Sequence, residues 1–320
     1  ARDSQEIATL PNGKIKKNHA WCAVKIEGEY RFVDCYLASQ FQPINEGIAE
    51  DHWFMTRPLE MIYTHLPASK AYQFLDPPID SEIYFALPYV CVPYFQNNLY
   101  LAKFDSSNLE LVDDQGKRSY SKCEGKIARL IHINTKIETR ISLSDEKRLT
   151  ITKKALAQCM YIGNTRICRV KAVLPPDCRV GWLKIYAGPR YVASGPNADK
   201  VINPYQLAFT YKLTHSGETS YPFEFVQKYH TPQEFYIQEP QCYNLFPLQT
   251  YTFKLFSLGG RNQKLALRSP GGRMYKLLYY PQDLSYDGTV TVSEVGIWNL
   301  VSLQQNTGGW HSIASWECTA

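Results

Sequence analysis

The sequence lacks most of the patterns that would point directly to a chemistry. No cysteines are spaced CxxC, no histidines and cysteines stand at metal-ligand intervals, and no asparagine begins an N-x-S/T acceptor. The longest apolar run, FALPYVCVPYF at 85–95, is too short to span a bilayer and holds two prolines. We therefore expect a cytoplasmic chain with no metal site, no cofactor and no membrane span, whose nine cysteines are reduced, buried thiols.

Patterns for nucleotide and nucleic-acid binding are also missing. No βαβ pattern is present, and the glycine pairs at 259–260, 271–272 and 308–309 lack the strand and helix context of a phosphate cradle. No nucleic-acid-binding motif accompanies the basic residues. These absences disfavour a doubly wound nucleotide fold, and we expect no nucleic-acid partner.

The sequence is instead rich in aromatic residues, with 23 tyrosines and 14 phenylalanines, which favour β structure. From about residue 98, short alternating runs such as GWLKIYAG, YTFKLFSL, RMYKLLYY and IWNLVSL are separated by turn residues. We predict a mainly β chain that is α+β at its N-terminus. Its expected domains are a first one over 1–95 and two antiparallel β-sandwiches, over 96–200 and 201–320, with a Gly/Pro-rich linker at 187–204.

The net charge of +5 is unevenly spread. There are eight basic against twelve acidic residues over 1–95, nineteen against ten over 96–200, and eight against eight over 201–320. The middle module is therefore predicted to be basic. Such a surface suits an acidic partner or an anionic membrane, although a merely solvated surface is the simpler interpretation.

The stretch NHAWCAVKIEGEYRFVDCYLAS at 18–39 predicts a hairpin with a two-residue turn at Glu27-Gly28. In that register the numbers of paired residues sum to 55, so Trp21 lies opposite Asp34. His19 is then diagonal to Asp34 on the same face and within reach of its carboxylate. Such a pair could belong to a catalytic triad or be an ordinary histidine–aspartate hydrogen bond.

This stretch resembles the second half of a transglutaminase-like core, in which an H-A-W strand and a V-D strand carry the histidine and aspartate of a Cys–His–Asp triad. The continuation DHWFMTRPLEMIYTHLP, read here as containing a short helix over 56–67, and then FALPYVCVPYF, is similar to the fungal cytokinesis protein 3 family, relatives of the kyphoscoliosis peptidase group. The later LRSPGGRMYKLLYY and EVGIWNLVSL resemble that family's C-terminal β modules. The resemblance implies a papain-like fold for 1–95, with His19 and Asp34 as triad residues.

The nucleophile that the resemblance calls for is missing. In such enzymes a cysteine opens a helix upstream of the histidine strand, yet no cysteine precedes position 22. Cys22 and Cys35 alternate onto the opposite face of the hairpin, away from His19 and Asp34. Either an upstream lobe lies outside this chain, or the chain has departed from the enzyme pattern. In both cases we expect no catalysis, with His19 and Asp34 as remnants of a triad.

By resemblance, the expected function is that of a non-catalytic interaction module that promotes septum formation at the actomyosin ring. The partners so implied are ring scaffold proteins and the septum-building chitin synthase, at the division site. Trp21, Tyr30, Phe32 and Trp53 are candidate exposed anchors for a partner, with core packing as the alternative for each. The alternative function is a cysteine peptidase or protein-crosslinking transglutaminase whose nucleophile lies outside this chain.

Overall fold

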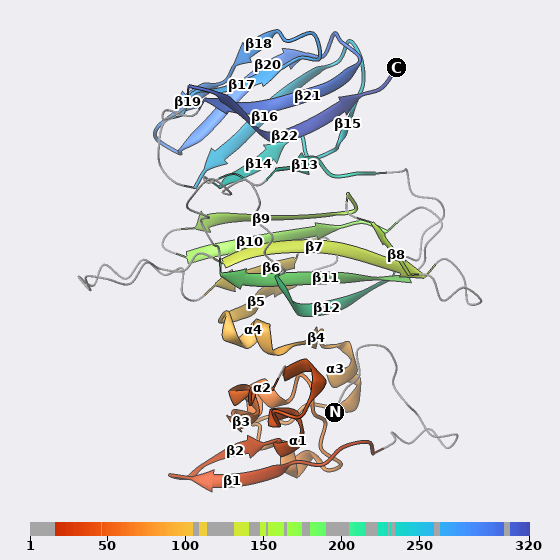
Figure 1. The fold of residues 1–320 in the computed structure, drawn as a ribbon, viewed down its shortest axis with the longest axis vertical. Coiled ribbons are helices and arrows are strands. Elements are labelled where there is room, and N and C mark those ends of the chain that lie inside the picture. The colour runs from red at the N-terminus through yellow and green to blue at the C-terminus, as the bar shows by residue number, and fades with distance from the viewer. Residues whose placement is uncertain are drawn as a thin grey trace. The chain divides into compact units, whose positions relative to one another are not determined.

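The computed structural model shows a mainly β chain, and the helices of the described residues lie within its first hundred residues (Figure 1). The structure describes residues 17–45, 47–104, 109–113, 131–140, 148–151, 153–162, 165–174, 180–189, 205–214, 223–229, 231, 234–258, 263–303 and 308–320. Residues 190–204 of the linker predicted at 187–204, and most of the loops of the basic module, lie outside these residues. The helices are α1 (Cys35–Ala38), α2 (Pro58–Met61), α3 (Ser81–Ala86) and α4 (Val92–Gln96), with 3-10 turns at Pro43–Asn45, Asp51–Trp53 and Lys70–Gln73.

The strands form five antiparallel-rich sheets. They are β1 (Cys22–Ile26), β2 (Glu29–Val33), β3 (Phe54–Thr56), β4 (Tyr89–Val90), β5 (Leu99–Phe104), β6 (Leu109–Asp113), β7 (Ile131–Arg140), β8 (Arg148–Ile151), β9 (Ala155–Ile162), β10 (Thr165–Ala172), β11 (Val180–Pro189), β12 (Gln206–Thr214), β13 (Gln227–Lys228), β14 (Phe235–Glu239), β15 (Asn244–Leu245), β16 (Thr250–Ser257), β17 (Leu265–Arg268), β18 (Met274–Lys276), β19 (Leu278–Tyr280), β20 (Ser285–Thr291), β21 (Gly296–Leu303) and β22 (Trp310–Cys318).

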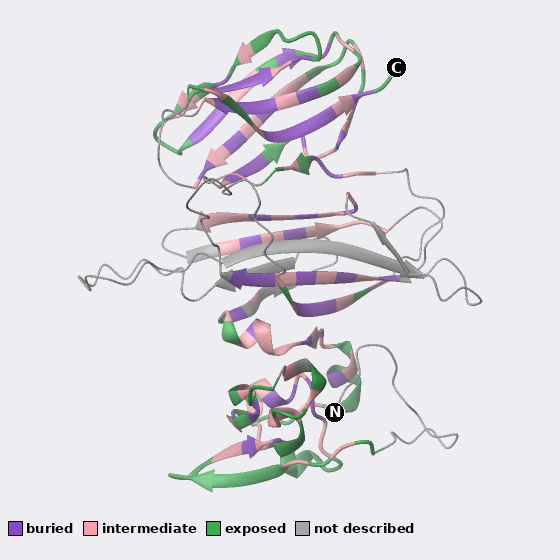
Figure 2. Cartoon of the chain, viewed as in Figure 1, coloured by how far each residue is buried: buried purple, intermediate pink, exposed green. Residues whose placement is uncertain are grey.

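The N-terminal hairpin has the register that the sequence predicts. Ala23 pairs with Phe32 and Lys25 with Tyr30, around a turn at Glu27-Gly28. Both turn residues have positive φ, 51° at Glu27 and 89° at Gly28, which matches a tight hairpin turn. The hairpin is not isolated, because β3 adds to β2 and makes a three-stranded sheet in the order β1-β2-β3. β1 is exposed along its whole length (Figure 2).

The helix expected over 56–67 is a single turn. α2 begins at Pro58, whose fixed φ suits the first helical position, and ends at Met61. The chain then continues in turns that bury Thr64 and His65. Met61 packs with Phe32 and Trp53 into the small core of this part of the chain. A short helix anchored by one buried side chain is thus enough to fix the segment that follows it.

The chain divides into two compact units, and their limits differ from the expected domain boundaries. The first unit holds residues 1–96 together with 207–212, and the second holds 97–206 and 213–320. β12 contains residues 207–212 and belongs to the five-stranded sheet of order β4-β12-β11-β7-β8. β12 pairs with β4 at Phe209 and Thr210, and the expected domain boundaries stay a prediction.

The C-terminal sandwich packs two sheets around a large aromatic and aliphatic core. One sheet has the order β13-β22-β21-β17-β18 and the other β14-β16-β20-β19. Trp298 and Trp316 are fully buried, and each donates its indole N–H to a backbone oxygen, that of Glu294 and that of Pro240 respectively. Burying two indoles with their polar edges satisfied gives this sandwich a rigid centre.

The run RMYKLLYY, predicted as one strand, is two. β18 ends at Lys276 in one sheet and β19 begins at Leu278 in the other, so the chain crosses the sandwich at Leu277. Leu277 is buried there, and a Cβ on Gly288 would stand 2.6 Å from its Cδ2. Strand propensity cannot reveal this crossing, because both halves of the run remain extended.

Within the second unit, side chains of β9 contact the C-terminal sandwich. The two predicted sandwiches therefore have separate sheets but share side-chain contacts. The Gln158 side chain donates to the Ile237 carbonyl oxygen at 2.9 Å and accepts from the Ile237 N–H at 2.8 Å. Leu156 belongs to the same buried cluster as Leu245 and Phe253. The Lys154 ammonium donates to the Phe223 carbonyl oxygen, so part of the basic module's charge is used inside the unit.

The sequence led us to expect that all the cysteines are reduced thiols, and this expectation is wrong. Cys159 and Cys168 face each other across β9 and β10 and form a disulfide. Their spacing of nine residues gave no signal, because only the hairpin register makes them direct neighbours. Among the described residues, no helix is long and apolar enough to cross a membrane.

Candidate functional site

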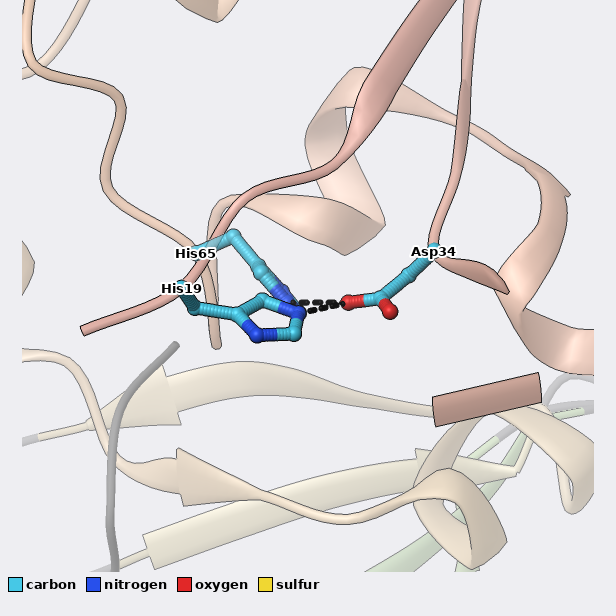
Figure 3. A group of neighbouring side chains, drawn as sticks. All are labelled: His19, Asp34 and His65. Carbon is cyan, nitrogen blue, oxygen red and sulfur yellow. Dashed lines mark hydrogen bonds and ion pairs between the residues drawn. The ribbon is translucent and has the colours of Figure 1, made fainter. Parts of the chain in front are cut away.

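His19 and Asp34 meet at the open end of the β1–β2 hairpin, as predicted. The His19 Nε2 atom lies 2.5 Å from the Asp34 Oδ2 atom (Figure 3). Neither residue is inside the strand ladder, because His19 precedes β1 and Asp34 follows β2. The turn at Glu27-Gly28 sets the register that carries them together.

Asp34 is fixed on both its main chain and its side chain. It is the N-cap of α1, and its Oδ1 atom accepts the Leu37 N–H at 2.9 Å. Its backbone N–H donates to the Trp53 carbonyl oxygen at 2.9 Å. The short helix after β2 therefore turns the carboxylate inward, which leaves the Oδ2 atom for other donors.

A second histidine, His65, completes the cluster and was missed by the sequence reasoning. Its Nε2 atom lies 3.0 Å from the Asp34 Oδ2 atom, and its Nδ1 atom lies 2.7 Å from the Thr64 hydroxyl oxygen. His65 comes from the turn after α2, on a different segment from both other members (Figure 3). No spacing rule pairs residues 31 apart, so only the fold could reveal this contact.

Asp34 and His65 are both fully buried as side chains, and their electrostatics follow from that. Burial alone would raise the pKa of Asp34, but hydrogen bonds from His65, Leu37 and His19 outweigh it and lower the pKa to about 2. Burial lowers the pKa of His65, and the neighbouring Asp34 only partly opposes this. At neutral pH the cluster therefore holds an ionised carboxylate against a neutral His65.

The proton positions can be assigned from these partners. A neutral His65 that donates from Nε2 to Asp34 accepts at Nδ1, so the Thr64 hydroxyl donates to it. His19 likewise donates to Asp34 through Nε2. Among the described residues no hydrogen bond reaches the Nδ1 atom of His19, and 14% of this side chain is exposed. His19 is thus oriented by a carboxylate with its other nitrogen open.

Aromatic rings enclose the cluster. The rings of Trp21 and Trp53 meet that of His65 edge to face, with centroids 4.9 and 5.4 Å apart, and Tyr36 meets His19 at 5.7 Å. Trp53 was expected as an exposed anchor, but it is buried in the core. Trp21 is half-buried, so it contributes to the wall of the site and only partly to its surface.

The other two candidate anchors pack on one ring. Tyr30 stacks on Phe74 with centroids 3.7 Å apart, and Phe32 lies 5.7 Å from the same ring. Phe32 is buried, which corrects its expected exposure, whereas Tyr30 is half-buried. Other large apolar side chains of this unit, which the sequence did not single out, are exposed. They include Tyr36, Phe41, Ile48, Phe54, Leu59 and Tyr72.

No cysteine of the described residues hydrogen-bonds to His19. Cys22 and Cys35 are exposed, the one at the start of β1 and the other at the first position of α1. Strand alternation applies to Cys22 alone, because Cys35 belongs to α1 and not to the hairpin. The part of the site that a nucleophile would occupy is therefore not filled by either of the two nearest thiols along the sequence.

His52 is a third histidine of this unit, and it is isolated. Its ring stacks on Phe95 with centroids 4.6 Å apart, and its Nε2 atom is buried without a hydrogen-bond partner among the described residues. Burial lowers the pKa of His52 to about 4, and the nearby His65 adds to this effect. His52 is thus held neutral at physiological pH.

Two chemistries are compatible with the cluster. A histidine oriented by a buried carboxylate can act as a general base if a nucleophile reaches its Nδ1 atom. Two imidazole nitrogens and a carboxylate oxygen are also a ligand set for a divalent metal, and in His19, Asp34 and His65 these atoms all lie within 4.8 Å of one another.

Comparison with known proteins finds similar proteins over almost the whole chain. Residues 228–318 match the family model of the CYK3 C-terminal Ig-like domain. Cytokinesis protein 3 of Saccharomyces cerevisiae is 29% identical over 344 aligned residues, covering 96% of this chain and 37% of that protein. Cytokinesis protein 3 of Schizosaccharomyces pombe is 28% identical, covering 95% and 35%. The chain thus spans about a third of the length of these relatives.

Hillarin of Drosophila melanogaster is similar over a shorter stretch, at 29% identity across 112 residues that cover 31% of this chain and 14% of that protein. Among solved structures, a chimeric titin Z1Z2 tandem covers 67% of this chain and 90% of its own, at 15% identity and a TM-score of 0.19. That score is too low to support an argument about the arrangement of this chain.

Proposed function

Because this chain is a homologue of the cytokinesis protein 3 proteins of yeasts, we propose that it acts in cytokinesis as a non-catalytic, transglutaminase-like interaction module. The observation that carries the proposal is the similarity to two such proteins over at least 95% of the chain. The match is not confined to one module, since the C-terminal sandwich also matches the Ig-like domain named for this family. We propose that the chain promotes septum formation at the actomyosin ring.

The geometry of the site supports the non-catalytic part of the proposal. Asp34 engages His19 and His65 with the same oxygen atom, so its carboxylate ties two segments together besides orienting one imidazole. Cys22 and Cys35 lie on the exposed side of their elements. A cluster with this much internal hydrogen bonding is suited to stabilising the hairpin end of the fold.

The partners we propose are ring scaffold proteins and the septum chitin synthase. The basic middle module could add an electrostatic contact with an acidic protein or the anionic inner leaflet, since lysine and arginine near such a surface contribute about 1 kcal/mol each. Some of its lysines are occupied within the fold, as Lys154 and Lys171 are. Binding to anionic vesicles that weakens with salt would support this contact.

The test of the role in division is a segment replacement in Saccharomyces cerevisiae. The part of cytokinesis protein 3 that matches this chain is deleted or is replaced by this chain, and septum closure is followed by time-lapse microscopy. We expect closure to be delayed by the deletion and restored by the replacement at equal protein level. Deletion without any effect on closure, or replacement without rescue, would contradict the proposed role.

A second candidate function is a cysteine peptidase or a protein-crosslinking transglutaminase. The specific observation in its favour is the Nδ1 atom of His19, which has no hydrogen bond from the described residues while Nε2 is held by Asp34. That is the orientation in which a histidine can accept a proton from a thiol. The discriminating feature is a nucleophilic cysteine, supplied from outside this chain at a helix N-terminus, that reaches the Nδ1 atom of His19.

A further inference from the structure

We propose that His19, Asp34 and His65 form a zinc-binding site. The two Nε2 atoms both face the Asp34 Oδ2 atom, and the three atoms, which come from three separate segments, lie within 4.8 Å of one another (Figure 3). Zinc is bound by histidine nitrogen and carboxylate oxygen, and sites with three protein ligands leave a fourth position for water. The proposal stands independently of the proposed role in cytokinesis.

The distances between the ligand atoms are close to those that zinc requires. Metal–ligand bonds of about 2.0–2.2 Å in a tetrahedron place ligand atoms about 3.3 Å apart. Without a metal, the Asp34 Oδ2 atom lies 2.5 Å from His19 Nε2 and 3.0 Å from His65 Nε2. An ion would therefore replace the two protons now shared with the carboxylate. The two oxygen–nitrogen distances would lengthen by less than about 1 Å, and the two histidine nitrogens, which lie within 4.8 Å of each other, would approach by up to about 1.5 Å.

The groups around the ligands suit a metal site once the hydrogen bond between Thr64 and His65 reverses its direction. A zinc-bound His65 carries its proton on Nδ1, which then donates to the Thr64 hydroxyl 2.7 Å away. The Thr64 hydroxyl can then donate its hydrogen bond to the Met61 carbonyl oxygen, which is 3.2 Å away. The other oxygen of Asp34 is held by the Leu37 N–H. Two of the three ligands thus have partners that fix their orientation.

The burial of the three residues favours a tightly held ion with a single point of entry. The Asp34 and His65 side chains are fully buried, whereas 14% of the His19 side chain is exposed. An ion would enter past His19. Bound zinc would cross-link three segments, namely the chain before β1, the start of α1 and the turn after α2. The residual triad pair would then have a structural use.

Spacing along the chain concealed this site. The sequence contains no histidines or cysteines at metal-ligand intervals, because His19 and Asp34 are 15 residues apart and Asp34 and His65 are 31 apart. Local motifs report only ligands on one helix or one turn. Here the ligands come from three segments, which are brought together by the hairpin register and by α2.

The test is isothermal titration of zinc chloride into the full chain after treatment with a chelator and dialysis. We expect one zinc ion per chain and a higher thermal midpoint in its presence. His19→Ala should weaken binding by about 100-fold or more, and Thr64→Val by about 10- to 100-fold, which is typical for loss of a ligand's hydrogen-bond partner. His19→Ala is the decisive variant, because the His19 side chain is partly exposed and its removal should leave the chain folded. Circular dichroism checks that the variant is folded.

Two matched variants separate this site from other zinc-binding groups. His311→Ala removes an exposed histidine from β22, and Cys35→Ser removes the thiol beside Asp34. Both should bind zinc as the unaltered chain does. Absence of stoichiometric binding, equal affinity in a folded His19→Ala chain, or a loss of binding in Cys35→Ser would each overturn the proposal.

Discussion

Asp34 is the residue on which the N-terminal cluster depends. It is fully buried, and its carboxylate accepts hydrogen bonds from His19, Leu37 and His65. An ionised group in that position is stable only while its partners remain, since an uncompensated buried charge is costly. The same residue caps α1, so its chemistry and the local backbone are linked.

Asp34→Asn should therefore destabilise the metal-free chain by about 2 to 4 kcal/mol, as an amide NH₂ would face the histidine donors and leave them unpaired. Urea unfolding followed by tryptophan fluorescence measures this. The control is Asp80→Asn, whose exposed ion pair with Lys70 should contribute no more than about 1 kcal/mol. Equal losses in the two variants would contradict the importance given to Asp34.

His52 predicts part of the pH dependence of stability. Its folded pKa of about 4 lies below the ordinary histidine value of 6.5, so the unfolded chain binds more protons between these two values. The contribution of His52 to stability is thus fully present above about pH 6.5 and is lost as the pH falls toward 4. Replacing it with glutamine should flatten the stability profile in that window.

The measurement is the free energy of unfolding of the His52→Gln chain and of the unaltered chain at several pH values from about 4 to 8. Subtracting one profile from the other removes the contributions of groups that both chains share. His311→Gln serves as control, since its exposed ring should leave the profile nearly unchanged. A difference profile that is flat between about pH 4 and 6.5 would show that His52 is not buried.

At the scale of elements, the hairpin β1–β2 is the feature that sequence reasoning described best. Its register was predictable because one glycine at a two-residue turn fixes every pair in the ladder. The third strand, β3, was not predictable, since Phe54–Thr56 is too short to show alternation. The crossing at Leu277 escaped for a related reason, because a strand that changes sheet keeps the same local pattern.

The turn itself gives a prediction at this scale. Gly28 has a φ of 89°, and no atom would lie within 4 Å of a Cβ added there, so a side chain meets backbone strain only. Gly28→Ala should destabilise the chain by about 1 kcal/mol, and Gly28→Asn by less, because asparagine tolerates positive φ. Thermal unfolding ranks the two. A glycine-like stability for the alanine variant would mean that this turn has another conformation.

At the scale of the whole chain, composition predicted the mainly β class. The Gly/Pro-rich stretch at 187–204 predicts a boundary between modules, and residues 207–212 group with the first compact unit. Long-range contacts such as those of Gln158 with Ile237 cannot be anticipated, because glutamine in a strand ordinarily faces solvent. His65 likewise could not be assigned to the site from the sequence, because it lies 31 residues from Asp34 and only the fold brings the two together.

Gln158→Met tests the connection between β9 and the C-terminal sandwich. It preserves volume but leaves the buried Ile237 N–H without its acceptor, which should cost about 1 to 3 kcal/mol, whereas the Ile237 carbonyl oxygen keeps the Gln241 side-chain amide as a donor. The measurement is urea unfolding of the full chain. Gln206→Met, at an exposed position of β12, should change stability by less than about 0.5 kcal/mol and is the matched control. An unchanged unfolding midpoint for Gln158→Met would argue against the join.

We propose above all that the His19–Asp34 pair does not serve acyl-transfer catalysis in this chain, and cysteine-directed labelling tests this most directly. The chain is treated with an active-site-directed alkylating probe, beside His19→Ala and, as a control, His311→Ala, and the modified cysteines are located by mass spectrometry. We expect the same slow labelling of exposed thiols such as Cys22 and Cys35 in all three chains. Rapid labelling of one cysteine that is lost only in His19→Ala would contradict the non-catalytic role.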